Sequence, residues 1–128
     1  MVGEVTVAVM AFNLLCTGTS AHYEMQKGLQ QKTGEQPFTV MLRVDLNAMR
    51  WCSEGCKIAE QVHAITDTRL LLSNTGNELH EMHLLSSLRY VDRETGRYFS
   101  RVKITSLIWV DTATCVRLPF TGLPPKVF

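Results

Sequence analysis

Residues 89 to 103 form the best candidate for binding chemistry in this sequence. They predict a hairpin around Asp92–Gly96, with a three-residue loop that pairs Arg93 with Arg97. In that register one face collects five basic residues and one aromatic residue: Arg89, Arg93, Arg97, Phe99, Arg101 and Lys103. Guanidinium groups match carboxylates and phosphates, so this face is a candidate site for an anionic ligand or a protein partner. The alternative is a solvated outer face whose charges deter edge pairing.

The segment Asn77–His83, which reads NELHEMH, carries side chains that can ligate a metal. It is not the HExxH motif, in which two histidines four residues apart share a helical face. On one continuous strand His80 and His83 point to opposite faces, which favours ordinary surface histidines. The sequence therefore predicts no metal site. A small metal-dependent hydrolase that uses His80, Glu81 and His83 is the alternative function.

The four cysteines are one near each end of the chain and a pair in the middle: Cys16, Cys52, Cys56 and Cys115. This layout favours the disulfides Cys16–Cys115 and Cys52–Cys56 among the three possible pairings. The competing interpretation is a reduced cytosolic protein with four buried thiols. A zinc site begun by Cys52, Cys56 and His63 lacks the usual finger spacing and a second ligand pair.

Motifs of catalysis are absent from the sequence, which contains no nucleophile elbow, phosphate loop or dinucleotide fingerprint. Trp51, beside Cys52, is interpreted as packed against a disulfide rather than as a cofactor contact, and Trp109, in an apolar stretch, as a core residue. The sequence thus predicts a non-enzymatic binding or envelope-associated module with no catalytic residues and no cofactor. It gives no strong nucleic-acid signal. A small protein inhibitor, acting through a protein–protein interface, is a further alternative.

The size and charge of the chain limit what can position these residues. It has 128 residues, 13 Lys and Arg against 12 Asp and Glu, and 45% hydrophobic residues. These values exclude disorder and functions that depend on bulk charge, and they fit one domain over residues 1–128.

Alternation of apolar and polar residues dominates the chain, most clearly from Phe38 to Leu46. It predicts an all-β or mostly β fold, a single antiparallel meander forming a small barrel or sandwich with at most one short helix. The expected elements are a strand at 5–17, a loop at 24–36, a short helix at 54–62, strands at 62–65 and 69–73, a turn at 74–77, long strands at 78–91 and 97–110, and an extended C-terminal strap at 118–128.

The N-terminus gives no visible secretion signal. The apolar stretch Val5–Phe12 is short, Glu4 precedes it, and no Lys or Arg occurs before Lys27. No run approaches the roughly 18 apolar residues that a membrane span needs. The cysteines nevertheless favour a periplasmic or secreted protein, with a cytoplasmic location as the alternative.

Several short motifs, in this order, resemble a family of small uncharacterised proteins of alphaproteobacteria that are usually exported. They are Phe12–Gly18, Arg43–Leu46, Arg50-Trp51-Cys52 with Cys56, Asp92–Gly96, and Cys115 followed by Pro119–Gly122. The resemblance implies a cysteine-bridged, exported β domain. It supplies no activity and no binding residues, and the N-terminus departs from the family because it lacks the expected signal.

Overall fold

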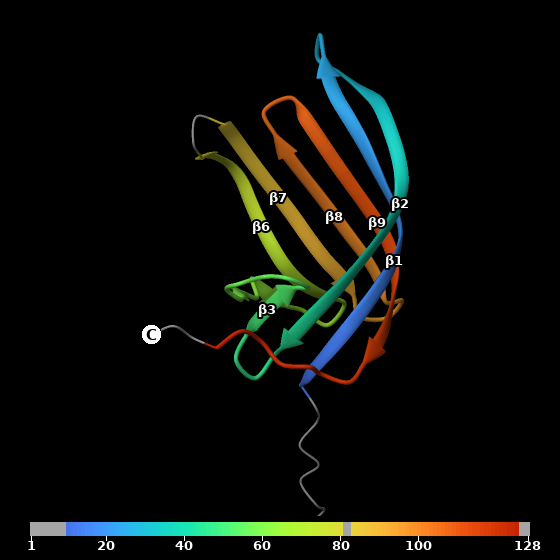
Figure 1. Cartoon of the computed structure of the whole chain (residues 1–128). Helices are drawn as coiled ribbons and strands as arrows, with labels where there is room; N and C mark the ends of the chain where they lie inside the picture. The colour runs from blue at the N-terminus through green and yellow to red at the C-terminus, as the bar shows by residue number, and fades with distance from the viewer. Residues whose placement is uncertain (1–9, 81–82, 126–128) are drawn as a thin grey trace, which may run out of the picture.

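The computed structural model describes residues 10–80 and 83–125, and these residues form one antiparallel sheet that curls into a half-barrel (Figure 1). The described part of the chain contains no helix. The predicted all-β meander is therefore confirmed, with a half-barrel in place of a closed barrel or a sandwich. Its nine strands are β1 Ala11–Gln26, β2 Leu29–Asp45, β3 Arg50–Ser53, β4 Glu60–Gln61, β5 Ala64–Ile65, β6 Arg69–His80, β7 His83–Asp92, β8 Arg97–Ile104 and β9 Leu107–Leu118.

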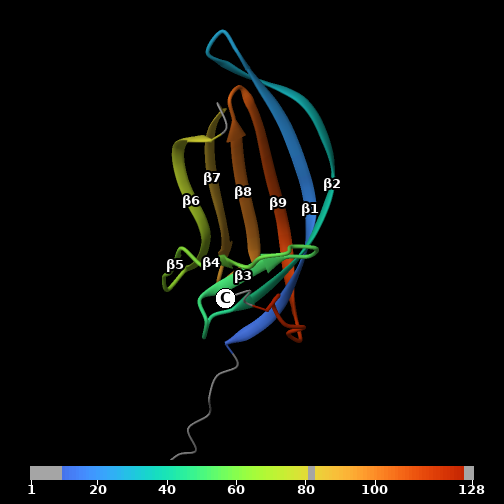
Figure 2. The ribbon, with the colours of Figure 1, turned by 60° about the vertical axis from the view of Figure 1, so that its left-hand side comes forward.

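The strand order explains how the first and last strands of the sheet come to lie side by side. It runs β4-β3-β2-β1-β9-β8-β7-β6-β5, so the first strand lies in the middle of the sheet, between β2 and the last strand. At one end of the half-barrel β3, β4 and β5 cross the concave side (Figure 2). At the other end the β1–β2 hairpin extends beyond the rest of the sheet and the concave side stays open (Figure 1).

The hydrophobic core fills the end that β3–β5 cover. Alternate residues of the long strands point into it, as the period-two pattern requires. From β3 the side chain of Trp51, 3% exposed, enters the core and donates a hydrogen bond from Nε1 to the carbonyl oxygen of Leu72 on β6, 3.2 Å away. Trp51 therefore joins the two sides of the half-barrel. The other core residues are Leu14, Cys16, Leu42, Val44, Val62, Leu70, Leu72, Val91, Tyr98 and Ala113.

Both predicted disulfides are present. Cys16 on β1 and Cys115 on β9 are register partners with Cα atoms 3.9 Å apart. The Cys115 N–H donates to the Gly96 carbonyl, on the side away from β1, so this is a non-hydrogen-bonded pair, the type whose Cα atoms lie closer. Cys52 and Cys56 form the local bridge. Two disulfides indicate an oxidising, extracytoplasmic compartment.

The expected loop at 24–36 is wrong. Residues 24–26 end β1 and residues 29–36 begin β2, joined by a two-residue turn of Lys27 and Gly28. Both turn residues have positive φ, 52° and 77°, as a type I′ hairpin turn requires. Most side chains of this arm are exposed, so no apolar alternation marks it in the sequence.

Three other expected elements are also corrected. Residues 54–62 form a turn and bends followed by β4, not a helix. The predicted turn at 74–77 lies inside β6, where the register shifts between Thr75 and Glu78, so its turn residues make an irregularity in a strand. The long strand expected at 97–110 is broken by a turn at Thr105 and Ser106, with Thr105 at φ 57°. Among the described residues, no helix is long and apolar enough to cross a membrane.

Residues 119–125 of the C-terminal strap form no regular secondary structure, Gly122 has a φ of 95°, and residues 126–128 lie outside the described part. It crosses β1 and β2. Asn13, 3% exposed, donates from Nδ2 to Thr121 Oγ1 at 2.9 Å, and its Oδ1 accepts from the Thr121 amide at 3.2 Å. Arg43 Nη1 donates to the Gly122 carbonyl at 3.1 Å.

Gly18, which lies opposite Ala113, has no room for a side chain. A Cβ there would lie 1.9 Å from the Thr112 carbonyl oxygen, a backbone atom. Gly18→Ala is therefore expected to lower the free energy of unfolding by about 1 to 3 kcal/mol, the usual cost of overpacking. Gly34→Ala, in the same hairpin with nothing within 4 Å of its added Cβ, is the matched control. Urea titration of both variants checks this, and equal midpoints would contradict it.

Candidate binding site on the concave face

The predicted cationic face is not formed, because the predicted register of the β7–β8 hairpin differs by one residue from the register in the structure. The loop has four residues, 93–96, between Asp92 and Arg97, instead of the expected three between Arg93 and Arg97, and Arg89 pairs with Ser100 instead of Arg101. Asp92 holds this turn by accepting the amides of Glu94 and Thr95 at 2.8 and 2.9 Å. These backbone hydrogen bonds, that of Thr95 first, lower the pKa of Asp92. A slip of one residue moves side chains to the opposite face of a strand.

The six predicted site residues are consequently divided. Arg89 lies on the concave face with its partner Ser100. Arg93 is in the turn, where its Nη1 donates to the Thr66 carbonyl. The others alternate along β8 onto the convex face: Arg97, Phe99, Arg101 and Lys103. There Phe99 stacks on Tyr90, with ring centroids 5.3 Å apart, and Arg97 and Phe99 border a shallow hollow of about 260 Å³.

The histidine segment is only partly described. His80 and His83 are register partners across the β6–β7 hairpin, so the expectation of one continuous strand through them is wrong. Glu81 and Met82 lie outside the described residues. Cys52 and Cys56 are joined in a disulfide, which removes both sulfur atoms from the zinc set considered with His63. No group of three or more His, Cys, Asp or Glu in the described residues is arranged to hold a metal.

A row of polar side chains crosses the concave face next to the core. Each member is the register partner of the next, and together they span six neighbouring strands from β2 to β6: Gln36, Ser20, Asp111, Ser100, Arg89 and Ser73. Ser20 and Ser100 are 5% and 1% exposed. The two charged members, Asp111 and Arg89, are separated by one strand, so their Cα atoms lie about 10 Å apart.

Asp111 lacks a partner that its position demands. Its Oδ1 is buried and receives no hydrogen bond from any residue that the structure describes. Buried polar atoms in native proteins nearly always have a partner, and one without a donor lowers stability. Burial raises the pKa of the neighbouring Tyr98, so its hydroxyl group stays protonated at neutral pH.

Four members of the polar row, Ser20, Gln36, Arg89 and Asp111, line an open cavity of about 470 Å³ on the concave face. Arg89 and Asp111 also border a second hollow of about 250 Å³ that leads toward Trp51. Aromatic rings form part of the walls. Phe38 stacks on Tyr98 with ring centroids 6.0 Å apart, and the rings of His22 and Trp109 make an edge-type contact with centroids 6.4 Å apart. This volume suits a small ligand.

Trp109 and Asp111 were not recognised as site residues from the sequence. Trp109, expected in the core, is only half-buried and borders the cavity. The available signal was parity: Trp109, Asp111 and Ala113 share one face of β9, and Ala113 is buried. A charged residue at an interior-facing position is the kind of exception that marks a binding site.

Comparisons of the chain with protein-family models, with curated proteins and with solved structures each found no match.

Proposed function

We propose that this protein is a non-enzymatic binding module that takes a small ligand in the concave cavity. The observation that carries the proposal is Asp111, which lines the open cavity and whose buried Oδ1 receives no hydrogen bond from the described residues. A ligand with an N–H or O–H group supplies the missing hydrogen bond when the carboxylate turns this oxygen toward the cavity. Because a bond to a charged acceptor is worth about 1.5 to 3 kcal/mol, this one contact gives substantial selectivity.

The residues around Asp111 define the class of ligand. Arg89, on the other side of Ser100, offers a guanidinium group to a carboxylate or another anionic group. Phe38 and Trp109 offer ring surfaces to an apolar part of the same molecule. The best fit is a small zwitterion, such as a free amino acid or short peptide, with its cationic group at Asp111. This retains the predicted anionic contact for Arg89 alone.

The free strand edges beside the cavity favour a small ligand over an added strand. β3 pairs only with residues 42–45 of β2, which leaves the edge of residues 29–41 without a second strand. The carbonyl of Met41 points to that edge, because it accepts a hydrogen bond from the amide of Glu54. Backbone groups of residues four apart in a strand point to the same side, so Pro37 also faces the edge, where it has no N–H to pair with an added strand. On the opposite side β6 carries two register shifts. Proline and bulges protect edges from strand addition.

The proposed location is the periplasm or the extracellular space. The two disulfides support this, since such bonds persist outside the reducing cytoplasm. A thiol count on unfolded protein, prepared without reductant, checks it, with no free thiol as the expected result. Membership of the exported alphaproteobacterial family stays a prediction.

Ligand binding is tested by thermal shift with panels of free amino acids, diamines, dicarboxylates and neutral sugars. The affinity of each compound that raises the melting temperature is then measured by calorimetry. We expect a zwitterionic probe to bind the native protein, and Asp111→Asn to weaken its binding by about tenfold or more. Asp67→Asn, in an exposed turn that does not line the cavity, is the matched control.

Other outcomes separate the alternatives. If Arg101→Ala with Lys103→Ala abolishes binding while Asp111→Asn does not, the ligand site lies on the convex face and the proposal is wrong. Hydrolysis of a test substrate that a chelator abolishes favours the metal-dependent hydrolase with His80, Glu81 and His83. Tight binding of a whole protein, undisturbed by cavity variants, favours the inhibitor.

A further inference from the structure

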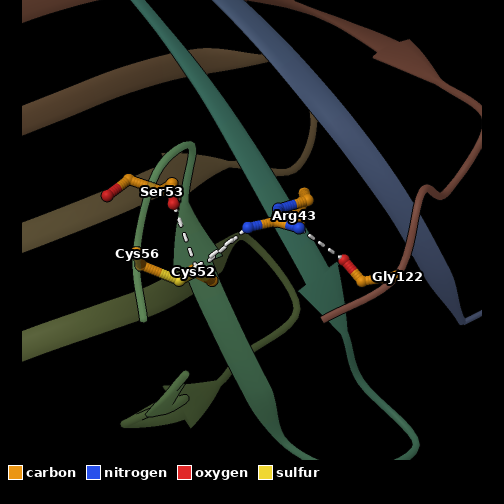
Figure 3. Close-up of a disulfide and its surroundings, with 5 residues drawn as sticks. All are labelled: Arg43, Cys52, Ser53, Cys56 and Gly122. Atoms are coloured by element: carbon orange, nitrogen blue, oxygen red, sulfur yellow. Dashed lines mark hydrogen bonds between the residues drawn. A yellow bond between two sulfur atoms is a disulfide. The ribbon is translucent and has the colours of Figure 1, made fainter. Parts of the chain in front are cut away.

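The local disulfide Cys52–Cys56 lies apart from the proposed ligand site. Cys52 is the register partner of Arg43, whose neighbours Leu42 and Val44 point into the core, so Arg43 and Cys52 project away from the concave side. The C-terminal strap passes over them at Gly122 (Figure 3). Cys52 is 1% exposed, whereas Cys56 is partly exposed. An incoming reagent therefore reaches the Cys56 sulfur first.

Arg43 gives this disulfide an unusual environment. Its Nη2 lies 3.4 Å from Cys52 Sγ and 3.9 Å from Cys56 Sγ, and its Nη1 donates to the Gly122 carbonyl (Figure 3). Its Nε is buried and has no hydrogen-bond partner within residues 10–80 and 83–125. These contacts include no carboxylate, so the guanidinium faces a neutral disulfide and a carbonyl oxygen. A cation beside a cysteine favours the thiolate and lowers the thiol pKa.

We propose that Cys52–Cys56 is a thiol–disulfide exchange site for small dithiols or for a cysteine pair of a partner. A thiolate of the dithiol attacks Cys56 Sγ and forms a new S–S bond with it. The Cys52–Cys56 bond breaks, and its electron pair leaves on Cys52 as a thiolate beside Arg43. This placement lowers the barrier, because a leaving thiol of low pKa leaves faster.

The second thiol of the dithiol completes the exchange. As a thiolate it attacks the dithiol sulfur of the mixed disulfide, which releases Cys56. Two electrons have then passed from the dithiol to the protein, the dithiol has become a disulfide, and the two cysteines take up protons from water. The Cys52 sulfur already lies 3.1 Å from the Ser53 carbonyl, an acceptor for the thiol once it is protonated (Figure 3).

The other disulfide provides an internal comparison. Cys16 is 0% exposed, and its bond to Cys115 lies between two central strands. Cys115, like Cys56, is partly exposed, so exposure alone does not separate the two disulfides, and the difference is the guanidinium group of Arg43 beside Cys52–Cys56. Selectivity between the two disulfides of one folded chain therefore distinguishes an exchange site from general susceptibility to reductant.

The test uses the folded, oxidised full chain with graded dithiothreitol and no denaturant. Thiols are trapped by acid and alkylation, and each cysteine is measured by peptide mass spectrometry. We expect Cys52–Cys56 to be reduced at least about tenfold faster than Cys16–Cys115 and Arg43→Gln to slow that reaction by about tenfold, the effect of roughly one to two pKa units on the leaving thiol. Arg43→Lys, which keeps the charge, should retain most of the rate.

Thr121→Val is the control for an indirect effect through the strap. This substitution removes the hydroxyl group that accepts a hydrogen bond from Asn13 in the strap contact, but it leaves Arg43 and both sulfur atoms in place. The rate at which Cys52–Cys56 is reduced should therefore stay unchanged. Circular dichroism establishes that each variant is folded. Reduction of both disulfides at the same rate overturns the proposal, as does an unchanged rate in Arg43→Gln. Equal slowing by Thr121→Val and Arg43→Gln also overturns it, because Arg43 would then act by fixing the strap.

Discussion

Replacing Cys16 and Cys115 together by alanine is expected to lower the free energy of unfolding by about 3 to 5 kcal/mol. The bond joins residues 99 apart in the sequence, and closing a loop of that length removes much of the conformational freedom of the unfolded chain. The chain-entropy model gives about 4.7 kcal/mol for about 100 residues. Because Cys16 is fully buried in the core, the lost sulfur contacts add to this effect. Urea unfolding of the oxidised protein measures it.

The double replacement of Cys52 and Cys56 by alanine is the matched control. These residues are only four apart, so the same model gives about 2 kcal/mol. The loss of the long bridge should therefore lower the free energy of unfolding by about 2.7 kcal/mol more in this model. Equal losses in the two double variants would show that local packing, and not loop closure, determines what each bond contributes.

Trp51→Ala is expected to lower the free energy of unfolding by about 3 to 5 kcal/mol, as large-to-small changes of buried aromatic residues do. Trp51 is 3% exposed, packs in the core cluster and bonds to the Leu72 carbonyl on the far side of the half-barrel. Its removal leaves a void where β3 meets β6 and an unpaired carbonyl. Denaturant unfolding followed by circular dichroism gives the value.

Two further variants separate the contributions of Trp51. Trp51→Phe keeps much of the apolar volume but loses the Nε1 donor, so it should cost less, about 1 to 2 kcal/mol. Trp109→Ala, at the half-buried wall of the open cavity, should cost less than Trp51→Ala. A larger loss from Trp109→Ala would mean that the open end, rather than the covered end, holds the half-barrel together.

The fold class was predictable because burial leaves a period-two signal wherever one face of a strand meets the core. Leu42 and Val44 alternate with Arg43 in this way, and both are 1% exposed or less. The same reasoning failed for residues 24–36, because most of their side chains are exposed and leave no apolar alternation in the sequence. They are strand residues because the end of β1 pairs with the beginning of β2. Parity and cysteine layout were thus sufficient for the architecture and the disulfides.

The candidate site was not predictable to the same degree. One extra residue in the turn after Asp92 moved Arg89 away from Arg101, and no local pattern distinguishes a three-residue from a four-residue turn at this sequence. The cavity residues come from strands far apart in the chain. Ser20 and Asp111 become neighbours only through the pairing of β1 with β9, so their association depends on the topology rather than on spacing.

The central position of β1 has a consequence for the order of events in folding. Its partner on one side, β2, follows directly, but its partner on the other side, β9, is the last strand of the sheet. During synthesis the β1–β2 hairpin therefore keeps one long edge of β1 unpaired until β9 has been made. Contacts of such high sequence separation make folding slow. The nascent chain is consequently most vulnerable to aggregation in this interval, and the Cys16–Cys115 bond can form correctly only at its end.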